Sequence, residues 1–304
     1  MNKPKIAIVI PCFNEERSID AVVNSFKKIL PEANIFVYDN GSNDNTTSVA
    51  LNAGAIVRNE PNRGKGNVIK RAFLDVDADI YVMVDGDATY DISQVDNLIE
   101  ILISENLDMI SGYRISDNLK GEYRPGHVFG NWLLSKTVST IFGKGFKDML
   151  SGYRVMSKRF VKSFPILSKG FEIETEMTIH CLQLGIAFKE LPVQYYPRKN
   201  GSQSKLKTYS DGFRILGLIF RLYKDEKPLQ FFLSISILLF LVSIVIAIPI
   251  FSTFIETGLV PRLPTAVLAT GLMILSFLSL ASGLILDGIS KTRSEIKKLS
   301  YLKY

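Results

Sequence analysis

The chain has 304 residues, a formal net charge of +6 and a hydrophobic share of 47%. This length accommodates one large domain with an appendage, or two ordinary domains. The positive charge suits an anionic membrane surface. No nucleic-acid partner is expected, because Lys and Arg do not cluster in one arm and no nucleic-acid-binding motif accompanies them. The only two cysteines, Cys12 and Cys181, exclude a disulfide framework and a zinc cluster.

Up to about Tyr196, short apolar runs alternate with amphipathic stretches, which predicts an α/β sheet with helices on its faces. The expected strands are Ile6–Ile10, Ile35–Tyr38, Ala55–Val57, Ile80–Val84 and Met109–Ser111. The expected helices are Ser18–Leu30, Gly66–Leu74 and Ser93–Ser104, with Ser18 and Ser93 as N-caps. Because Lys5–Pro11 already has the pattern of a buried strand, no signal peptide is expected at the start.

The C-terminal part contains two stretches without a charged residue, Leu229–Phe251 and Leu263–Leu286. Crossing the hydrocarbon core of a bilayer takes about 20 apolar residues, and each stretch is that long. The alternative is a pair of buried core helices. The short connection predicts an antiparallel transmembrane hairpin, in which Ser279 and Gly283 allow close contact between the helices. Lys and Arg flank both outer ends, so both flanks are expected in the cytoplasm.

The strongest local signal for chemistry is the triplet Asp85-Gly86-Asp87, directly after the apolar run Ile80–Val84. Two carboxylates one residue apart at a strand end can hold Mg²⁺ or Mn²⁺ and leave room for phosphate oxygens. The small Gly86 lets a diphosphate approach the backbone. A solvated turn uses the same residue types, so the triplet alone leaves both interpretations open.

Two further polar turns, Pro11–Glu16 and Asp39–Ser42, follow the first two predicted strands. Turns at the carboxyl edge of a sheet are where α/β folds bind nucleotides. The carboxylate of Asp39 can accept hydrogen bonds from a nucleobase or a ribose. No Gly-x-Gly-x-x-Gly follows the first strand, which argues against a dinucleotide-binding dehydrogenase.

Taken in order, these turns together with Asn62–Asn67 resemble the nucleotide-sugar half of family 2 glycosyltransferases, which have the GT-A fold. The segments Asp148–Arg154, Phe171–Glu176 and Arg198–Lys205 are similar to the polyprenyl-phosphate branch of that family. This branch contains dolichol-phosphate mannose synthases and bacterial undecaprenyl-phosphate glycosyltransferases. The resemblance extends from about Lys5 to Lys207, and the two-span tail fits one subgroup of the branch.

The resemblance implies a role for each motif residue. The nucleotide-sugar would be bound by Pro11, Asn14, Glu15, Asp39, Lys65 and Asp85. Asp85 and Asp87 would hold Mg²⁺ or Mn²⁺, with Asp87 as the principal ligand. The diphosphate or the acceptor phosphate would be contacted by Arg198, Ser204 and Lys205, and the lipid phosphate gripped by Arg114 and Arg154. Some relatives carry Gln as a further ligand where this chain has Thr89.

A lipid phosphate acceptor also has consequences for the reaction. A phosphate monoester has its second pKa at about 6, so at neutral pH much of it is a dianion that needs no side-chain base. We therefore expect direct displacement at the anomeric carbon, with inversion and a β-linked product. The residues expected at the catalytic site are Asp87, Arg114, Arg154 and Glu174. Among them, Glu174 is assigned a binding or orienting role. The product would be a polyprenyl-phosphate-sugar that serves envelope glycan synthesis or modification.

The expected organisation is a GT-A catalytic domain over 1–207, an interfacial amphipathic helix over 208–228, a transmembrane hairpin over 229–287 and a basic cytoplasmic tail over 288–304. The protein is expected in the inner membrane as a multi-pass protein, with the catalytic domain and both termini in the cytoplasm. Its expected partners are the nucleotide-sugar, polyprenyl phosphate and the lipid bilayer. The oligomeric state stays open, a homo-oligomer included.

The sequence leaves several alternatives open. A UDP-sugar such as UDP-glucose or UDP-N-acetylglucosamine and undecaprenyl phosphate are favoured, but the sequence does not identify the sugar. The acceptor could be another lipid or a glycan, and a non-catalytic membrane protein that binds the lipid carrier keeps the same fold. A processive polysaccharide synthase normally has more spans and a Gln-x-x-Arg-Trp motif, which Trp132 lacks. A sugar nucleotidyltransferase has a Gly-rich loop with Arg and Lys, which Pro11–Glu16 is not.

Overall fold

The computed structural model describes residues 3–115, 125–143, 145–170, 172–197, 217 and 220–303. The chain divides into two compact units. The first contains Met1–Ile215 together with Ile296–Tyr304, and the second contains Leu216–Glu295.

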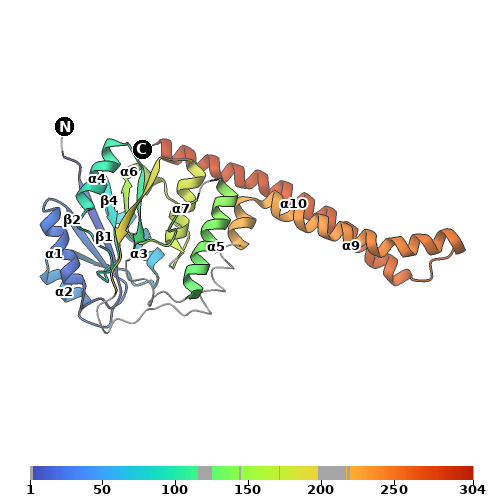
Figure 1. The fold of residues 1–304 in the computed structure, drawn as a ribbon, viewed down its shortest axis with the longest axis horizontal. Coiled ribbons are helices and arrows are strands. Elements are labelled where there is room, and N and C mark those ends of the chain that lie inside the picture. Colours follow the sequence, from blue (N-terminus) through green and yellow to red (C-terminus); the bar gives the residue numbers. More distant parts are fainter. Residues whose placement is uncertain are drawn as a thin grey trace. The chain divides into compact units, whose positions relative to one another are not determined.

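The first unit is built on a sheet whose described strands have the order β3-β2-β1-β4-β6-β5-β7 (Figure 1). The strands are β1 (Ile6–Cys12), β2 (Asn34–Asp39), β3 (Ile56–Asn59), β4 (Ile80–Met83), β5 (Met109–Ile115), β6 (Arg154–Ser157) and β7 (Phe188–Gln194). Strands β3, β2, β1 and β4 are parallel, whereas β6 lies antiparallel between β4 and β5. The parallel strands therefore bring the turns after β1, β2 and β4 to one edge.

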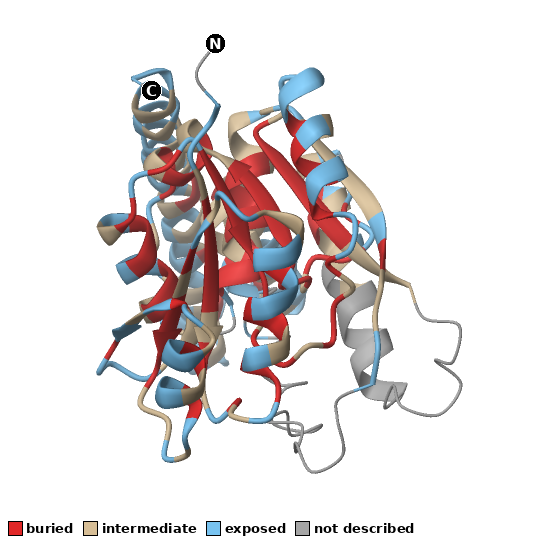
Figure 2. Cartoon of the chain, turned by 90° about the vertical axis from the view of Figure 1, so that its left-hand side faces the viewer, coloured by how far each residue is buried: buried red, intermediate tan, exposed pale blue. Residues whose placement is uncertain are grey.

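Helices cover both faces of this sheet. They are α1 (Ile19–Ile29), α2 (Thr46–Asn52), α3 (Lys65–Asp75), α4 (Val95–Ser104), α5 (Pro125–Phe142), α6 (Lys158–Ser163) and α7 (Ile173–Leu184). Helices α1 and α4 share one hydrophobic cluster with alternate residues of β1 and β4, such as Ile8 and Val82. On the other face Phe73 of α3 packs edge-on against Tyr81 of β4. Figure 2 shows the resulting buried strands between helices whose outer surfaces are exposed, as expected for parallel strands covered on both sides.

Of the two predicted helix caps, Ser18 does occupy the N-cap position of α1, whereas Ser93 was wrong. The hydroxyl of Ser18 donates to the backbone carbonyl of Gly86 at 2.8 Å and makes no capping hydrogen bond to α1. Helix α4 starts at Val95 after Gln94, while Ser93 donates its backbone N–H to the carboxylate of Asp91. In both places a polar residue satisfies a turn instead of the first helical N–H groups.

The second unit contains α9 (Pro228–Thr257) and α10 up to Glu295, from the full helix Leu263–Leu302. Both helices are long and apolar enough to cross a membrane, with mean hydropathy of 3.0 and 2.0, and their apolar windows are only 11% and 17% buried. So little burial argues against core helices of a soluble protein.

Hydroxyl groups and a glycine join α9 to α10. The hydroxyl of Ser279 donates to the carbonyl of Phe232 at 2.9 Å, and that of Ser276 donates to the carbonyl of Ser236 at 2.9 Å. A Cβ atom at Gly283 would come within 3.0 Å of the Cβ of Phe232. The close approach predicted at Ser279 and Gly283 agrees with these contacts, because small residues and hydroxyls are what joins helices in lipid.

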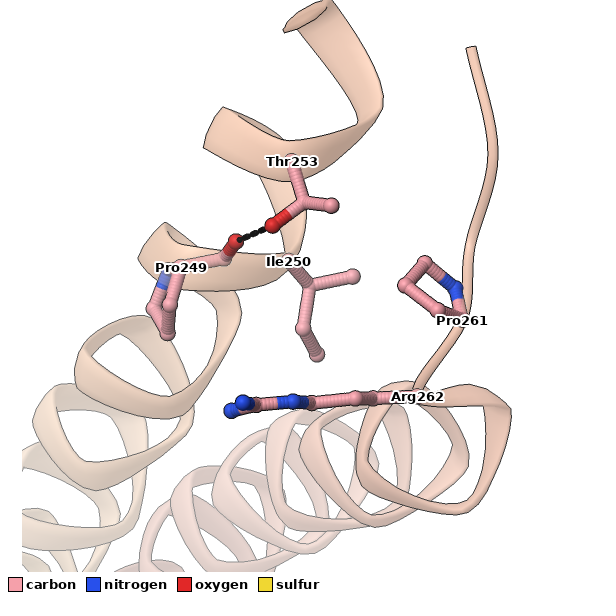
Figure 3. Close-up of a pocket in the computed structure, with 5 residues that line it drawn as sticks. All are labelled: Pro249, Ile250, Thr253, Pro261 and Arg262. Carbon is pink, nitrogen blue, oxygen red and sulfur yellow. Dashed lines mark hydrogen bonds between the residues drawn. The ribbon is translucent and has the colours of Figure 1, made fainter. Parts of the chain in front are cut away.

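A pocket of about 230 Å³ lies near the connection between α9 and α10 (Figure 3). It is lined by Pro249, Ile250, Thr253, Pro261 and Arg262. Arg262 extends beneath Ile250, and the hydroxyl of Thr253 donates to the carbonyl of Pro249. Its lining contains one cation and no carboxylate, so it lacks the chemistry predicted for a metal and nucleotide site.

The last turns of α10 belong to the first unit. The hydroxyl of Tyr301 donates to the carboxylate of Asp108 at 2.6 Å. Asp108 is 1% exposed and also accepts hydrogen bonds from Ser157 and Arg159. Tyr301 thus supplies a donor to a buried carboxylate of the first unit, and the assignment of 288–304 as a basic cytoplasmic tail stays a prediction.

The buried His180 of α7 predicts a pH-dependent stability. It packs against the rings of Phe160 and Phe164, and burial, with a smaller effect of Lys297, lowers the pKa of His180 to about 3. An unfolded His has a pKa of about 6.5. The unfolded chain therefore binds this proton first, so stability is complete above about pH 6.5 and is lost as the pH falls toward 3.

Between pH 7 and pH 5 this effect should cost about 2 kcal/mol, from a pKa lowered to about 3. We expect His180→Gln to remove this part of the loss of stability between pH 7 and pH 5. The measurement is thermal unfolding of the full chain in detergent at fixed ionic strength. An unchanged pH dependence in the variant would contradict the assignment.

Candidate functional site

Three turns meet at the carboxyl edge of the parallel strands. Pro11 pairs with Tyr38 and Cys12 with Asp39 in the register of β1 and β2. The turn after β4 is tied to this region because Gly86 accepts the Ser18 hydrogen bond. The segments that carry Pro11, Asp39 and Asp85 are therefore neighbours, as the sequence predicted for a nucleotide-binding edge.

The turn after β1 is fixed to the turn after β2. Asn14 donates its backbone N–H to the hydroxyl of Ser42 at 2.8 Å, and its side-chain oxygen accepts from the backbone of Asn43 at 2.9 Å. The backbone of Glu15 donates to Thr46 at 2.8 Å. Asn14 adopts a positive φ of 53°, a conformation that Asn tolerates better than most residues. Asn14 and Glu15 thus hold the two turns in one arrangement.

Asp39 ends β2 as an oriented acceptor. It is 6% exposed, and its carboxylate accepts hydrogen bonds from the backbone N–H of Ser42 at 3.1 Å and from the Ser42 hydroxyl. The next residue, Asn40, was not predicted as a site residue. Its side chain donates to the carbonyls of Glu60 and Asn62 and accepts from the backbone of Gly64, so it fixes the glycine-containing turn that precedes α3.

Lys65 lies at the centre of the site, between two carboxylates. Its Nζ is 2.5 Å from the carboxylate of Asp85 and 2.5 Å from that of Glu174. The side chains of Lys65 and Glu174 are 8% and 5% exposed, whereas that of Asp85 is 31% exposed. Burial lowers the pKa of Lys65, but the charges of Asp85 and Glu174 outweigh it and raise that pKa above its ordinary value. Lys65 therefore stays charged.

Glu174 has one oxygen on Lys65, while its Oε2 is buried and finds no hydrogen-bond partner among the described residues. Burial raises the pKa of Glu174, and the nearby Lys65 only partly offsets this. A buried, unsatisfied carboxylate oxygen is costly unless a ligand or water completes it. This atom is a candidate acceptor for a hydroxyl of a bound substrate.

Two glycines bring Lys65 within reach of Glu174. Gly64 has a φ of 126°, and a Cβ atom there would collide with the carbonyl of Lys169. A Cβ at Gly66 would collide with the carbonyl of Ser168, and its backbone N–H donates to the carbonyl of Gly170 at 3.1 Å. These contacts pack the start of α3 directly against the loop that leads into α7.

Asp87 lies in the turn after β4, two residues beyond Asp85. It is 5% exposed, and its Oδ1 accepts from the hydroxyl of Thr89 at 2.6 Å and from the Thr89 backbone at 3.2 Å. Gly86 is required by packing, since a Cβ there would be 2.6 Å from the sulfur of Cys12. Its role in admitting a diphosphate, predicted from the sequence, stays a prediction.

The carboxylates of Asp85 and Asp87 fit a particular kind of metal site. No group of three or more His, Cys, Asp or Glu in the described part of the chain could hold a metal ion by itself. Mg²⁺ and similar hard cations are commonly bound by one or two carboxylates together with substrate phosphates and water. The residues present therefore fit a cation that is shared with a diphosphate, and do not fit a structural metal centre.

The two predicted phosphate-gripping arginines differ. Arg114 makes a bidentate pair with Asp148, at 2.6 Å and 2.8 Å. Burial raises the pKa of Asp148, but the Arg114 guanidinium outweighs it and holds that pKa below the ordinary value. The side chain of Arg114 is 19% exposed and close to the ring of Tyr195. The Arg114 side chain is therefore partly accessible and is held by its counter-ion Asp148.

Arg154 is 0% exposed, which corrects the prediction that it grips a lipid phosphate. Its guanidinium donates to the backbone carbonyls of Met149, Ser151 and Glu174 and to the hydroxyl of Thr178. The preceding segment Ser151–Tyr153 is part of the core. The hydrogen bonds of the Arg154 side chain named above all go to groups inside the domain. Arg154 instead fixes the first turn of α7, from which Glu174 reaches Lys65.

The predicted phosphate-binding residues Arg198, Ser204 and Lys205 lie outside the described residues. The described chain reaches Pro197, directly before them. The backbone of Tyr196 donates to the carbonyl of Thr89 at 2.7 Å, so the end of β7 lies against the turn that carries Asp87. The assignment of Arg198, Ser204 and Lys205 to phosphate binding stays a prediction.

Comparison with known proteins identifies the domain. The sequence model of Glycosyl transferase family 2 matches residues 7–163. Glycosyltransferase AglJ of Haloferax volcanii is 33% identical over 232 residues, which is 76% of each chain. A dolichyl-phosphate hexose transferase of the same organism is 25% identical over 222 residues, covering 73% of this chain and 95% of the relative.

Solved structures confirm the predicted GT-A fold. Glucosyl-3-phosphoglycerate synthase from Mycobacterium tuberculosis, in complex with Mn²⁺, UDP and phosphoglyceric acid, superimposes with a TM-score of 0.59. The match covers 73% of this chain and 78% of that one, at 22% identity. At this identity the likeness establishes the fold.

The buried lysine predicts a measurable coupling. Lys65→Met leaves Glu174 and Asp85 without their ammonium group, and breaking a buried ion pair in this way costs about 3–5 kcal/mol of stability. Glu174→Gln removes one of the stranded charges. We therefore expect Lys65→Met to destabilise the wild-type background more than the Glu174→Gln background, in a double-mutant cycle followed by chemical unfolding.

Lys70→Met on the exposed side of the same helix is the matched control and should leave stability near the wild-type value. Destabilisations of the two single variants that simply add in the double variant would show that Lys65 and Glu174 are not coupled.

Proposed function

The chain belongs to Glycosyl transferase family 2, and we propose that it transfers a sugar from a nucleotide-sugar to polyprenyl phosphate. The observation that carries this proposal is the group Asp85, Asp87, Lys65 and Glu174 at the carboxyl edge of the sheet. Fixed carboxylates that can share a cation, next to a permanently charged lysine, suit a diphosphate-linked donor. The same chain also contains two apolar helices that fit membrane association.

The acceptor class follows from the relatives and the helices together. A dolichyl-phosphate hexose transferase aligns over 73% of this chain, and a polyprenyl phosphate is a lipid that resides in the bilayer. We favour undecaprenyl phosphate as acceptor and a UDP-sugar such as UDP-glucose or UDP-N-acetylglucosamine as donor. UDP is the nucleotide in the related fold of glucosyl-3-phosphoglycerate synthase, where it is bound with Mn²⁺.

The nucleotide-sugar is assigned to the edge formed by Pro11, Asn14, Glu15, Asp39 and Asp85. Asp39, already oriented by Ser42, offers an acceptor to a nucleobase or ribose. Lys65 would contact the donor while its ammonium remains paired with Glu174. The buried Oε2 of Glu174 accepts a hydrogen bond from a sugar hydroxyl, which positions the donor and needs no proton transfer.

The reaction is a direct displacement at the anomeric carbon. An oxygen of the acceptor phosphate forms the new bond to carbon as the bond to the nucleoside diphosphate breaks, which inverts the configuration. The acceptor is already largely a dianion at neutral pH, so no side-chain base is required. Asp85 and Asp87 would hold a divalent cation, Mg²⁺ or Mn²⁺, which when bound neutralises the leaving diphosphate as a Lewis acid.

Cationic side chains would hold the acceptor. Arg114 is partly exposed and oriented by Asp148, and its planar guanidinium suits contact with a phosphate. Arg198, Ser204 and Lys205 are proposed as further phosphate contacts. The Lys and Arg residues at both outer ends of the hairpin support the proposal that the catalytic unit and both termini face the cytoplasm at the inner membrane.

The proposal predicts metal-dependent sugar transfer to a lipid. Purified protein in detergent is given undecaprenyl or dolichyl phosphate, a panel of radiolabelled UDP- and GDP-sugars, and Mn²⁺ or Mg²⁺. We expect a chloroform-soluble product that disappears with EDTA. Asp87→Ala should reduce the rate at least about 100-fold, because the loss of a single stabilising group at a reacting charge has this scale.

Asp96→Asn, an exposed carboxylate on α4, is the matched control and should retain full activity. Labelled product formed on a glycan or another lipid, and not on either polyprenyl phosphate, would favour the alternative acceptor. Equal signals from wild type and Asp87→Ala would exclude the catalytic interpretation and leave a protein that only binds the carrier.

A further inference from the structure

The loop over 165–170, which leads from α6 into α7, has little support from the hydrophobic core. None of its residues is buried, and Leu167 is 75% exposed. Burial of apolar surface therefore contributes little to the position of this loop. Its position has to come mainly from polar contacts.

Glu176 of α7 supplies the polar contact near the start of the loop. One oxygen of its carboxylate accepts the backbone N–H of Leu167 at 3.0 Å, and the other accepts that of Ser168 at 2.9 Å. Hydrogen bonds to an ionised carboxylate are stronger than neutral ones, and successive backbone N–H groups often bind an anionic group together. Glu176 therefore fixes two consecutive peptide groups with one side chain.

The loop held by Glu176 contacts the start of α3 through its backbone. The carbonyl of Gly170 accepts the backbone N–H of Gly66 at 3.1 Å. A Cβ atom at Gly64 or at Gly66 would collide with a carbonyl of the loop. Lys65 lies between these two glycines, so its backbone is held against the loop at the residue before it and at the residue after it.

Helix α7 therefore reaches the start of α3 by two routes. The direct route is the ion pair between Lys65 and Glu174, and the indirect route runs from Glu176 through the loop. Residues two apart in an α-helix point about 200° apart around its axis, so Glu174 and Glu176 lie on opposite faces of α7. Losing the indirect route would remove the contact of α7 with the backbone around Lys65.

We propose that Glu176 is a positioning residue that holds the loop against the backbone around Lys65, and so places the Lys65 ammonium group for contact with the nucleotide-sugar. Each oxygen of Glu176 binds the loop, so this carboxylate acts through Lys65 and not on the substrate. The placement of Lys65 concerns the first unit alone, whereas its consequence for the nucleotide-sugar rests on the proposed function.

The first test measures the coupling between Lys65 and Glu174 and needs no turnover. Double-mutant cycles with Lys65→Met and Glu174→Gln are followed by chemical unfolding of the full chain in detergent, in the wild-type, Glu176→Ala and Glu176→Gln backgrounds. Ala removes both contacts to the loop, whereas Gln keeps the size and one oxygen. We expect Glu176→Ala to reduce the coupling, as a ratio of unfolding equilibrium constants, at least about 5-fold, and Glu176→Gln to reduce it less.

The second test compares the two substrates in the sugar-transfer assay. We expect Glu176→Ala to raise the KM for the nucleotide-sugar at least about 10-fold, the scale of a lost hydrogen bond to a charged group, and Glu176→Gln to raise it less. The KM for polyprenyl phosphate should stay unchanged, because the acceptor is assigned to Arg114. Glu100→Gln, at an exposed position of α4, is the matched control and should leave the coupling and both KM values unchanged.

Unchanged coupling in the Glu176 variants overturns the inference, because a residue that only stabilises the fold lowers stability without changing the coupling. Equal rises in the two KM values also contradict it. If Glu176→Ala does not fold, Glu176→Gln decides both tests by the same criteria. A wild-type protein that transfers no sugar would contradict the proposed function, and the coupling would still decide the placement of Lys65.

Discussion

The ammonium group of Lys65, buried between Asp85 and Glu174, is the interaction on which the arrangement of the site depends. Its partners come from distant parts of the chain, the end of β4 and the first turn of α7. The buried charges of Lys65 and Glu174 would each be costly in the interior without a partner of opposite charge. Their mutual pairing therefore fixes where α3, β4 and α7 stand relative to one another.

Neighbouring features of the first unit support this pairing. Gly64 and Gly66 let the start of α3 pack against the loop before α7. Arg154 donates to the backbone carbonyl of Glu174 in the first turn of α7. Packing and hydrogen bonds thereby hold Lys65, Asp85 and Glu174 in place, which is the preorganisation that the proposed transfer between two phosphate-bearing substrates would require.

The sequence predicted the strands and turns that build the nucleotide edge, because alternating apolar runs and polar turns are local signals. It missed β6 and β7, whose positions depend on pairing with β4 and β5 across the chain. The role of Arg154 could not be predicted, since a motif shows the presence of a guanidinium but not its burial.

The same limit applies to Tyr301, whose hydroxyl donates a hydrogen bond to the carboxylate of Asp108, a residue far away in the sequence. A contact across such a separation leaves no pattern in the sequence. Asn40 was within local reach, because a polar residue directly next to a predicted site residue, here Asp39, is a candidate to orient that part of the site.

The most direct test of the account is the position of Mn²⁺ in crystals of the protein grown with UDP, located by its anomalous scattering. The account predicts one Mn²⁺ within coordination distance of the Asp87 carboxylate and of the diphosphate, with Lys65 still paired with Glu174. A metal bound elsewhere, or UDP bound away from Asp39 and Asp87, would contradict it.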